Sequence, residues 1–310
     1  MLRAGVIIVQ QFLSRIMDLL CACPPGHVPC LAVTGAGGKS SLAAGLSIHL
    51  SKAGHSGIIA PSTRIYMPRP RSCSPEEEQR LAECGTQTCD ALLLRRGRSD
   101  RALSEELRAV LCTMDGVPRR LLPLPEKSSA LCPNRALCLV LGEEVVRHSP
   151  RSKLRGLSPE TICRLKQFLE KEKLSRRAVL LVEADGAARH PLKAHAAHEP
   201  QIPSCADLVV AVMGLDALGK PLATVVHRPE LAAERLGVTL YAPVTPRMAA
   251  TLLLHEEGPF RGTPSSARRI VLLNKTDVLD PSQGKLLDEL LESLHVPGGP
   301  DEILLHGNNA

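Results

Sequence analysis

The stretch VTGAGGKS, residues 33–40, follows a short apolar run and decides which fold to expect. Glycine permits positive φ angles and lets backbone N–H groups approach an anion closely. A helix that starts near Lys39 would aim the positive end of its dipole at the same anion. The Lys39 ammonium would reach the β- and γ-phosphates of a nucleotide, and the Ser40 hydroxyl would bind Mg²⁺. The predicted nucleotide-binding residues of this phosphate loop are Gly35, Ala36, Gly37, Gly38, Lys39, Ser40 and Ser41.

The loop departs at one position from the full phosphate-loop pattern, G-x-x-x-x-G-K-[ST]. Val33 stands where the pattern has its first glycine, whereas Gly38, Lys39 and Ser40 fit it. An ordinary glycine-rich turn between a strand and a helix is the alternative. The apolar run before the loop and the helical pattern at residues 40–53 favour the phosphate loop, because such a loop needs both neighbours.

Short apolar runs alternate with helical patterns along most of the chain. Continuous apolar runs are typical of parallel strands that are buried on both faces, and strand–helix alternation indicates a doubly wound sheet. We therefore expect a single α/β domain over residues 1–310 that is P-loop NTPase-like, with a doubly wound, mostly parallel sheet. The expected strands cover residues 31–34, 57–60, 137–141, 178–182, 208–213, 270–273 and 303–305.

Residues 64–135 interrupt this alternation. The segment is rich in proline, arginine, serine and glutamate, and its best helix candidates are residues 75–84 and 104–111. A long connection of this composition is typical of irregular chain. We therefore expect an irregular insertion or lid within the single domain.

The overall composition narrows the function classes. The 310 residues carry a formal charge of +6 without a block of like charges, and only 2% are aromatic, so nucleic-acid binding is not favoured. No apolar stretch has the roughly twenty residues that cross a bilayer. Residues 1–20 combine apolar positions at helical spacing with polar interruptions, which favours an amphipathic helix over a signal peptide. We expect a cytoplasmic protein without a membrane partner.

The eleven cysteines lack paired spacing, which indicates a reducing compartment rather than a disulfide framework. Cys21, Cys23, Cys30 and His27 lie close enough in the sequence to be drawn as a metal site. A cysteine-rich helix end followed by the start of a strand is the simpler interpretation, and we favour it over a metal site.

Two carboxylates follow the predicted strand at residues 178–182. Glu183 and Asp185 lie at its carboxyl end, which is the edge where parallel sheets bind ligands. One carboxylate would hold the water shell of Mg²⁺, and the other would orient an attacking water. We expect Ser40 and Asp185 to be metal-binding residues, and Lys39, Glu183 and Asp185 to be catalytic. A solvated turn at the strand end is the alternative.

The sequence NKTD at residues 274–277 follows another predicted strand and has the form N-K-x-D, the guanine-reading motif of GTPases. Asp277 would accept two hydrogen bonds from the N1–H and N2–H₂ groups of guanine, a donor pair that adenine lacks. Asn274 would support the other edge of the purine, and Lys275 would lie along the ring. A turn that caps a helix is the alternative. We favour the base reader, and with it GTP over ATP.

Further polar side chains lie between these motifs. Arg228 would act as a catalytic residue by neutralising charge on a transferring phosphoryl group, although Pro229 and Glu230 after it also suit a helix N-terminus. Both interpretations are compatible. Three histidines suggest a site for a metal or a selenium species, but a surface loop is the more common arrangement. These histidines are His190, His195 and His198.

Several longer strings carry a family resemblance. Together with the phosphate loop and NKTD, they are similar to the YqeC-type family of selenium cofactor biosynthesis proteins, over about residues 31–54 and 137–277. The chain departs from that family after the second strand, where members carry a threonine-rich run with histidine and this chain has PSTRI at residues 61–65. The strings are KLRGL (153–157), EADGA (183–187), PLKA (191–194), HEPQIP (198–203), GLDALGKPL (214–222) and HRPE (227–230).

The resemblance implies an accessory role toward selenium-dependent molybdenum hydroxylases. We therefore expect a nucleotide-binding accessory protein, a Mg²⁺-dependent GTPase or ATPase, whose partners are such a hydroxylase or its cofactor-assembly proteins. One alternative is an ATP-dependent ligase or transferase, because Val33 and Thr34 suit the T-G-x-x-G-K-S loop of peptidoglycan ligases. Another is a switch that binds nucleotide without hydrolysing it and presents a surface to a partner.

Overall fold

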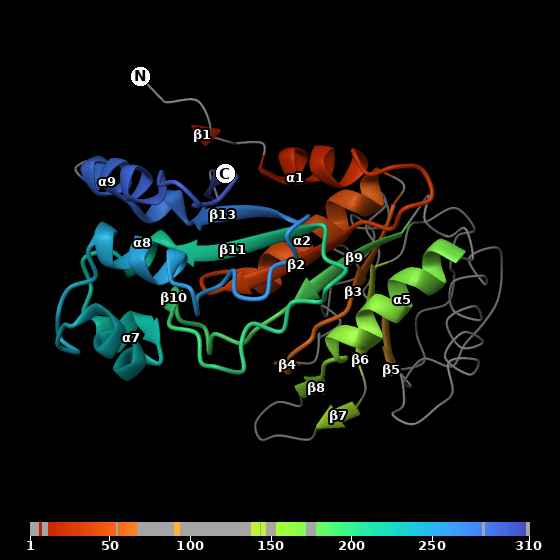
Figure 1. Ribbon diagram of the computed structural model, residues 1–310, viewed down its shortest axis with the longest axis horizontal. Coiled ribbons are helices and arrows are strands. Elements are labelled where there is room, and N and C mark those ends of the chain that lie inside the picture. The colour runs from red at the N-terminus through yellow and green to blue at the C-terminus, as the bar shows by residue number, and fades with distance from the viewer. Residues whose placement is uncertain are drawn as a thin grey trace, which may run out of the picture.

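The computed structural model describes residues 6–7, 12–53, 55–66, 90–93, 138–142, 144–146, 153–171, 178–280 and 283–307. A nine-stranded sheet lies at its centre, and every pair of neighbouring strands is parallel. This sheet confirms the expected α/β class (Figure 1). From edge to edge, the strands are β1 (Val6–Ile7), β14 (Glu302–His306), β13 (Arg268–Asn274), β11 (Leu208–Gly214), β2 (Cys30–Gly35), β9 (Ala178–Glu183), β3 (Ser56–Ile59), β6 (Cys138–Gly142) and β5 (Asp90–Leu93).

All seven strands expected from apolar runs are present, and each lies within two residues of its predicted bounds. Every residue of β2, β9 and β11 is buried, which explains why these segments are apolar without alternation. The helix expected at residues 40–53 is α2 (Lys39–Lys52). The expected N-terminal amphipathic helix is α1 (Phe12–Cys21), which buries Phe12 and Ile16.

Most of the expected insertion lies outside the described residues, namely residues 67–89 and 94–135, and so do both of its helix candidates. Its described parts are regular. β5 pairs with β6 at the edge of the central sheet. β4 (Ile65–Tyr66) belongs to a separate antiparallel sheet with β8 (Lys153–Arg155) and β7 (Glu144–Val146). The segment therefore contributes strands to two sheets, which its composition did not indicate.

Helices cover both faces of the central sheet (Figure 1). α1 and α2 pack on the face that presents Leu31 and Val33 of β2. α5 (Pro159–Lys171) packs on the opposite face, which presents Ala32. α8 (Pro246–Leu254) and α9 (Gly284–Leu294) cover that opposite face over β11, β13 and β14. This arrangement confirms a doubly wound sheet.

The strand order brings the predicted motifs to one edge of the sheet. β9, β2, β11 and β13 are consecutive neighbours, and since all are parallel their carboxyl ends lie together. Those ends are Glu183, Gly35, Gly214 and Asn274. The chain leaves β2 toward β3 on one side and passes from β11 to β13 on the other, so the direction of winding reverses beside β2. Parallel sheets bind ligands at such a reversal.

Short elements follow the strands at this edge. β10 (Leu192–Lys193) pairs in parallel with β12 (Val226–His227). After β11 come η3 (Leu215–Ala217), α6 (Leu222–Val225) and α7 (Pro229–Leu236), and η4 (Thr276–Val278) follows β13. In the described part of the chain, no helix has the length and apolar character needed to cross a membrane.

Candidate functional site

The loop between β2 and α2 follows a path that depends on glycine. Gly35, Gly37 and Gly38 have φ angles of 85°, 83° and 135°, which residues with a Cβ rarely adopt. A Cβ on Gly37 would lie 2.3 Å from the backbone nitrogen of Gly214, and one on Gly38 would lie 2.3 Å from Asn274 Nδ2. The backbone path and the close packing therefore both require glycine here.

Replacing Gly37 with alanine is expected to lower the free energy of unfolding by about 2 kcal/mol, because the new Cβ meets backbone atoms at an unfavourable φ angle. Gly45 is the matched control, since it lies inside α2 with open space at its Cβ position. Gly45→Ala should raise the free energy of unfolding by about 0.5–1 kcal/mol. Urea unfolding followed by circular dichroism measures both variants. Equal stabilities would contradict the close packing of the loop.

Three amides of the loop already donate to acceptors within the protein. The first N–H groups of a helix have no acceptor inside that helix. The amides of residues 38–41, at the start of α2, are therefore the ones that remain for an anion. The three internal bonds run from Gly35 to Asp185 Oδ2 (2.9 Å), from Ala36 to the Val212 carbonyl (2.8 Å) and from Gly37 to the His190 carbonyl (3.0 Å).

Lys39 begins α2 and is buried against the segment that follows β9. Its ammonium lies 3.1 Å from Asp185 Oδ1, and it donates a hydrogen bond to the Gly35 carbonyl. The Lys39 side chain is 4% exposed and that of Asp185 is fully buried. Asp185 Oδ1 makes this ion contact but no hydrogen bond, so it depends on the Lys39 charge. Residues predicted from two separate motifs thus form one buried ion pair.

Two more side chains hold Asp185. Lys193 Nζ lies 3.2 Å from Asp185 Oδ2, and His195 Nε2 lies 2.6 Å from the same oxygen. Burial alone would raise the pKa of Asp185, but Lys39, His195 and Lys193 together hold that pKa well below its usual range. Burial lowers the pKa of His195 in spite of the carboxylate, so its ring is neutral at pH 7. Asp185 is therefore a charged carboxylate enclosed by donors.

Glu183, the last residue of β9, lies beside Ser40. The Ser40 hydroxyl donates to Glu183 Oε2 at 3.0 Å. Burial raises the pKa of Glu183, although Lys39 and Ser40 partly compensate. A buried carboxylate next to a hydroxyl gains stability from a nearby cation. The structure thus brings Ser40 to Glu183, whereas Asp185, which the sequence pairs with Ser40 as a metal ligand, contacts Lys39.

The NKTD turn is joined to the phosphate loop by Asn274. Its Nδ2 donates to the Gly37 carbonyl at 2.7 Å, and its Oδ1 accepts from the Lys275 N–H at 2.9 Å. Lys275 has a φ angle of 65°, and its ammonium donates to Asp216 Oδ2 at 2.7 Å. Asp277 lies in η4 and is exposed. The two motifs form one structural unit, with Asp277 at its surface.

Arg228 is farther from the loop. It is the N-cap residue of α7 with a φ angle of 63°, and its Nη1 lies 2.6 Å from Glu199 Oε2. The same oxygen lies 2.8 Å from Lys193 Nζ, which also contacts Asp185. Arg228 therefore reaches Lys39 only through a chain of three intervening charged residues. The helix start that Pro229 predicts after Arg228 is confirmed.

The three histidines predicted as a possible cluster are separated. His195 is buried beside Asp185, the His190 ring packs against His227 with ring centres 5.8 Å apart, and the His198 side chain is 72% exposed. Among the described residues, no group of three histidine, cysteine or acidic side chains is arranged to hold a metal ion. Cys23, Cys30 and His27, which follow α1, likewise form no such group among the described residues.

Lys193 is the site residue that sequence reasoning did not assign a role. Burial lowers the pKa of Lys193, although the carboxylates of Asp185 and Glu199 oppose that shift. Its Nζ also donates to the Gly186 carbonyl. A single lysine in a two-residue strand has no periodic signal. The sequence pointed to it in two ways, through the string PLKA of the family resemblance and through its position beside the three histidines.

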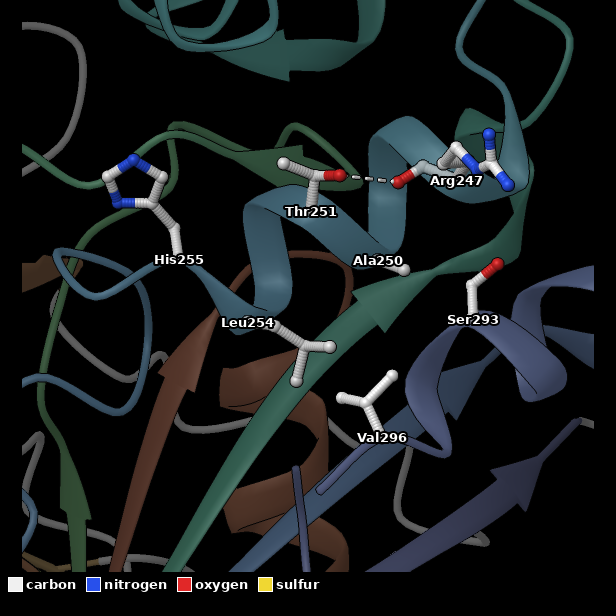
Figure 2. A pocket seen from close by; sticks show the side chains of 7 residues that line it. All are labelled: Arg247, Ala250, Thr251, Leu254, His255, Ser293 and Val296. Carbon is white, nitrogen blue, oxygen red and sulfur yellow. Dashed lines mark hydrogen bonds between the residues drawn. The ribbon is translucent and has the colours of Figure 1, made fainter. Parts of the chain in front are cut away.

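A groove of about 480 Å³ lies elsewhere, between α8 and α9 (Figure 2). Thr251 Oγ1 donates to the Arg247 carbonyl along one wall, as the dashed line in Figure 2 shows. The lining includes none of the predicted nucleotide-binding residues, so we do not place the site there. The lining residues are Arg247, Ala250, Thr251, Leu254, His255, Ser293 and Val296.

Comparison with known proteins agrees with the resemblance carried by the sequence. A family model described as "YqeC protein" matches residues 31–230, more than half of the chain. The chain is 36% identical over 126 residues to "Uncharacterized protein YqeC" of Escherichia coli (strain K12), and the match covers 40% of this chain and 47% of that protein. The chain thus spans about half the length of that relative. No solved structure gives a significant match. The chain therefore belongs to the YqeC protein family.

Proposed function

We propose that this protein binds a purine nucleoside triphosphate at the loop between β2 and α2 and hydrolyses it with Mg²⁺, preferring GTP to ATP. The proposal depends above all on Lys39, a buried ammonium at the start of α2 beside a glycine loop that excludes side chains. The position of this loop, at the reversal point of a parallel sheet, supports a P-loop NTPase-like fold.

In this proposal, the phosphates take the place of Asp185 as the anion that Lys39 contacts. Lys193, His195 and the Gly35 amide would continue to hold the carboxylate after Lys39 turns toward the ligand. The amides of residues 38–41 would supply further donors to the phosphates. Asp185 would keep three partners on Oδ2, and the phosphates would compensate the buried charge of Lys39.

Ser40 and Glu183 fit a Mg²⁺ ion. Hydroxyl and carboxylate oxygens are the ligands this cation prefers, and the two groups already lie 3.0 Å apart. Burial raises the pKa of Glu183, and a bound cation would stabilise its charged form. Bound Mg²⁺ would supply that positive charge and would also neutralise the phosphates. Glu183 would also orient an attacking water, while Asp185 holds Lys193 and His195 beside the site and Arg228 stabilises the ion-pair chain behind it.

Titration calorimetry with GTP, ATP and their diphosphates, each with Mg²⁺ and with EDTA, tests the proposal. We expect a heat of binding with both triphosphates, a higher affinity for GTP than for ATP, and release of inorganic phosphate. No heat with any nucleotide would contradict the proposal. Binding without phosphate release would instead favour the non-hydrolysing switch, and turnover that requires an acceptor carboxylate would favour the ligase.

Asp277→Asn is expected to reduce the preference for GTP over ATP by about 10- to 100-fold, because the amide cannot accept both hydrogen bonds from guanine. Binding of ATP should change little. Asp288→Asn is the matched control, since Asp288 is also an exposed aspartate and lies on α9. Competition titrations of GTP against ATP measure the ratio. An unchanged ratio in Asp277→Asn would count against the base-reading assignment.

The chain belongs to the YqeC family, and its sequence resemblance to the YqeC-type selenium cofactor biosynthesis proteins supports a role near that pathway. We propose that nucleotide turnover here serves the maturation of a selenium-dependent molybdenum hydroxylase. The test is to co-express such a hydroxylase with the wild-type chain or with Lys39→Ala and to measure the selenium content of the purified enzyme. Equal selenium content would separate the nucleotide site from this pathway without affecting the proposal of nucleotide binding.

A further inference from the structure

Three cysteine side chains lie close together at the amino-terminal ends of the parallel strands, on the side of the sheet away from the loop between β2 and α2. Cys30 is the first residue of β2, Cys163 lies on α5, and Cys205 lies in the loop before β11. The side chain of Cys205 interacts with the side chains of both other cysteines. Cys163 Sγ also lies 3.6 Å from the hydroxyl of Ser204, the residue before Cys205. The proposed nucleotide chemistry uses none of these thiols.

The loop that carries Cys205 is fixed on two sides. The Asp207 N–H donates to the Cys30 carbonyl and Asp207 Oδ2 accepts from the Cys30 N–H, both at 2.8 Å. Lys166 Nζ donates to the Cys205 carbonyl at 3.0 Å and to Asp207 Oδ2 at 2.8 Å. Cys163 lies one helical turn before Lys166, on the same side of α5. Backbone hydrogen bonds and a buried lysine therefore hold the three thiols together.

Other charged groups complete the surroundings of this cluster. His27 Nε2 lies 2.8 Å from Asp207 Oδ1, and His27 Nδ1 lies 3.4 Å from Glu170 Oε1. Lys166 is a cation close to the thiols, because its ammonium donates a hydrogen bond to the Cys205 carbonyl. Asp207 pairs with Lys166 through Oδ2 and contacts the His27 ring through Oδ1, so both of its carboxylate oxygens have partners.

The three thiols differ in access and in protonation. Cys30 is fully buried, whereas Cys163 and Cys205 are partly exposed. The hydrogen bond from Cys30 lowers the pKa of Cys205 to about 7, assisted by Cys163 and by the charge of Lys166 and opposed by burial. The bond to Cys205 and burial raise the pKa of Cys30, and burial raises the pKa of Cys163. A reachable thiolate at Cys205 thus lies beside two protonated thiols.

We propose that Cys205 and Cys163 form a thiol–disulfide exchange site for low-molecular-weight disulfides. Cys30 acts as a positioning residue, because its buried thiol donates a hydrogen bond to Cys205 and cannot itself reach a solvent-borne disulfide. Within the described residues, no triple of ligating side chains is arranged around a metal position, which favours exchange chemistry over a metal centre.

The exchange has two balanced steps. The Cys205 thiolate attacks one sulfur of R–S–S–R, a protein–S–S–R bond forms, the original S–S bond breaks, and R–S⁻ leaves. The Cys163 sulfur, after losing its proton to solvent, attacks Cys205 Sγ, forms the Cys163–Cys205 bond and expels the second R–S⁻. Two electrons pass from the two cysteines to R–S–S–R, which becomes two thiols.

The test uses full-length protein and glutathione disulfide at pH 7, followed by acid quenching, alkylation of the remaining thiols and peptide mass spectrometry. We expect a Cys163–Cys205 disulfide in the wild type, and a mixed glutathione disulfide trapped on Cys205 in Cys163→Ser. Cys205→Ser should show neither product. Cys23→Ser is the matched control, since Cys23 lies outside the cluster and is also partly exposed. It should give the wild-type products.

The rate of alkylation of Cys205 provides a second measurement. At pH 7 a thiol with a pKa of about 7 is ionised about 50-fold more than one with the ordinary value of 9.0, and its lower intrinsic nucleophilicity offsets part of that gain. We expect Cys205 to react about sixfold faster in the folded protein than in the urea-unfolded chain. Cys30→Ala should move the midpoint of the pH–rate profile upward, and Cys30→Ser should restore it in part.

Two results would overturn the proposal. One is the absence of any mixed disulfide on Cys205 in folded Cys163→Ser. The other is a Cys205 alkylation rate in the folded protein no greater than in the unfolded chain. The exchange site does not depend on the nucleotide proposal, because Lys39→Ala should leave both thiol measurements unchanged. Failure of one proposal can therefore be told apart from failure of the other.

Discussion

Lys39→Ala is expected to weaken the binding of GTP and ATP about 100-fold, the largest effect of any single substitution on ligand binding. A hydrogen bond from an ammonium to a charged acceptor contributes about 1.5–3 kcal/mol, and Lys193, a second buried cation beside Asp185, already pairs with Asp185 and Glu199. Titration calorimetry measures the dissociation constants. Wild-type affinity in the folded variant would remove the main support for the nucleotide site.

Controls separate lost binding from lost folding. Lys285→Ala removes an exposed lysine from α9 and should leave nucleotide affinity unchanged. Lys39→Ala also deprives Asp185 of one partner, so its thermal unfolding must be compared with that of the wild type without nucleotide. If the variant does not fold, Ser40→Ala takes its place, because Ser40 is exposed and its loss should weaken only the Mg²⁺-dependent part of binding.

Asp185→Asn is expected to lower the free energy of unfolding by about 3 kcal/mol, the largest effect on stability. The substitution leaves Lys39 and Lys193 buried without the carboxylate between them, and removing one partner of a buried ion pair typically costs this much. Urea unfolding at pH 7 measures the change. Asp216→Asn is the matched control, because the Asp216–Lys275 pair is partly exposed and should contribute about 1 kcal/mol or less.

The pH dependence of stability gives this prediction a second readout. Because the folded protein lowers the pKa of Asp185 below its ordinary value of 3.8, the unfolded chain takes up the proton first as the pH falls. The contribution of Asp185 is therefore complete above about pH 4 and is lost as the pH falls further. The difference between wild type and Asp185→Asn should shrink in that acid range. A difference that is constant from pH 7 to pH 3 would contradict a charged Asp185.

Much of the fold could be predicted because its strands are buried on both faces. Seven apolar runs correspond to strands of the central sheet, and the glycine loop with the helix after it was placed correctly. β10 and β12 could not be predicted, since two residues show no periodicity. β5 lies in a segment whose overall composition indicates irregular chain, although its own four residues pair with β6.

The candidate site was predictable in its parts but not in its pairings. Motifs at the ends of parallel strands must share one edge, which is why Ser40 lies near Glu183 and Asn274 near the phosphate loop. Whether Glu183 or Asp185 lies beside Ser40 or Lys39 depends on the strand order and on the turn after β9. The sequence alone therefore could not assign Asp185 to Lys39, and it carried no pattern that would link Lys193 to either residue.

β2 connects the two proposed sites of this molecule. The strand begins at Cys30, in the thiol cluster, and ends at Gly35, in the phosphate loop, so six residues span about 17 Å between them. Neighbouring strands pair with both of its edges and all six residues are buried, which leaves it little freedom to adjust at one end alone. A bulkier side chain at Ala32, midway along this rigid spacer, should therefore disturb thiol reactivity and nucleotide affinity together.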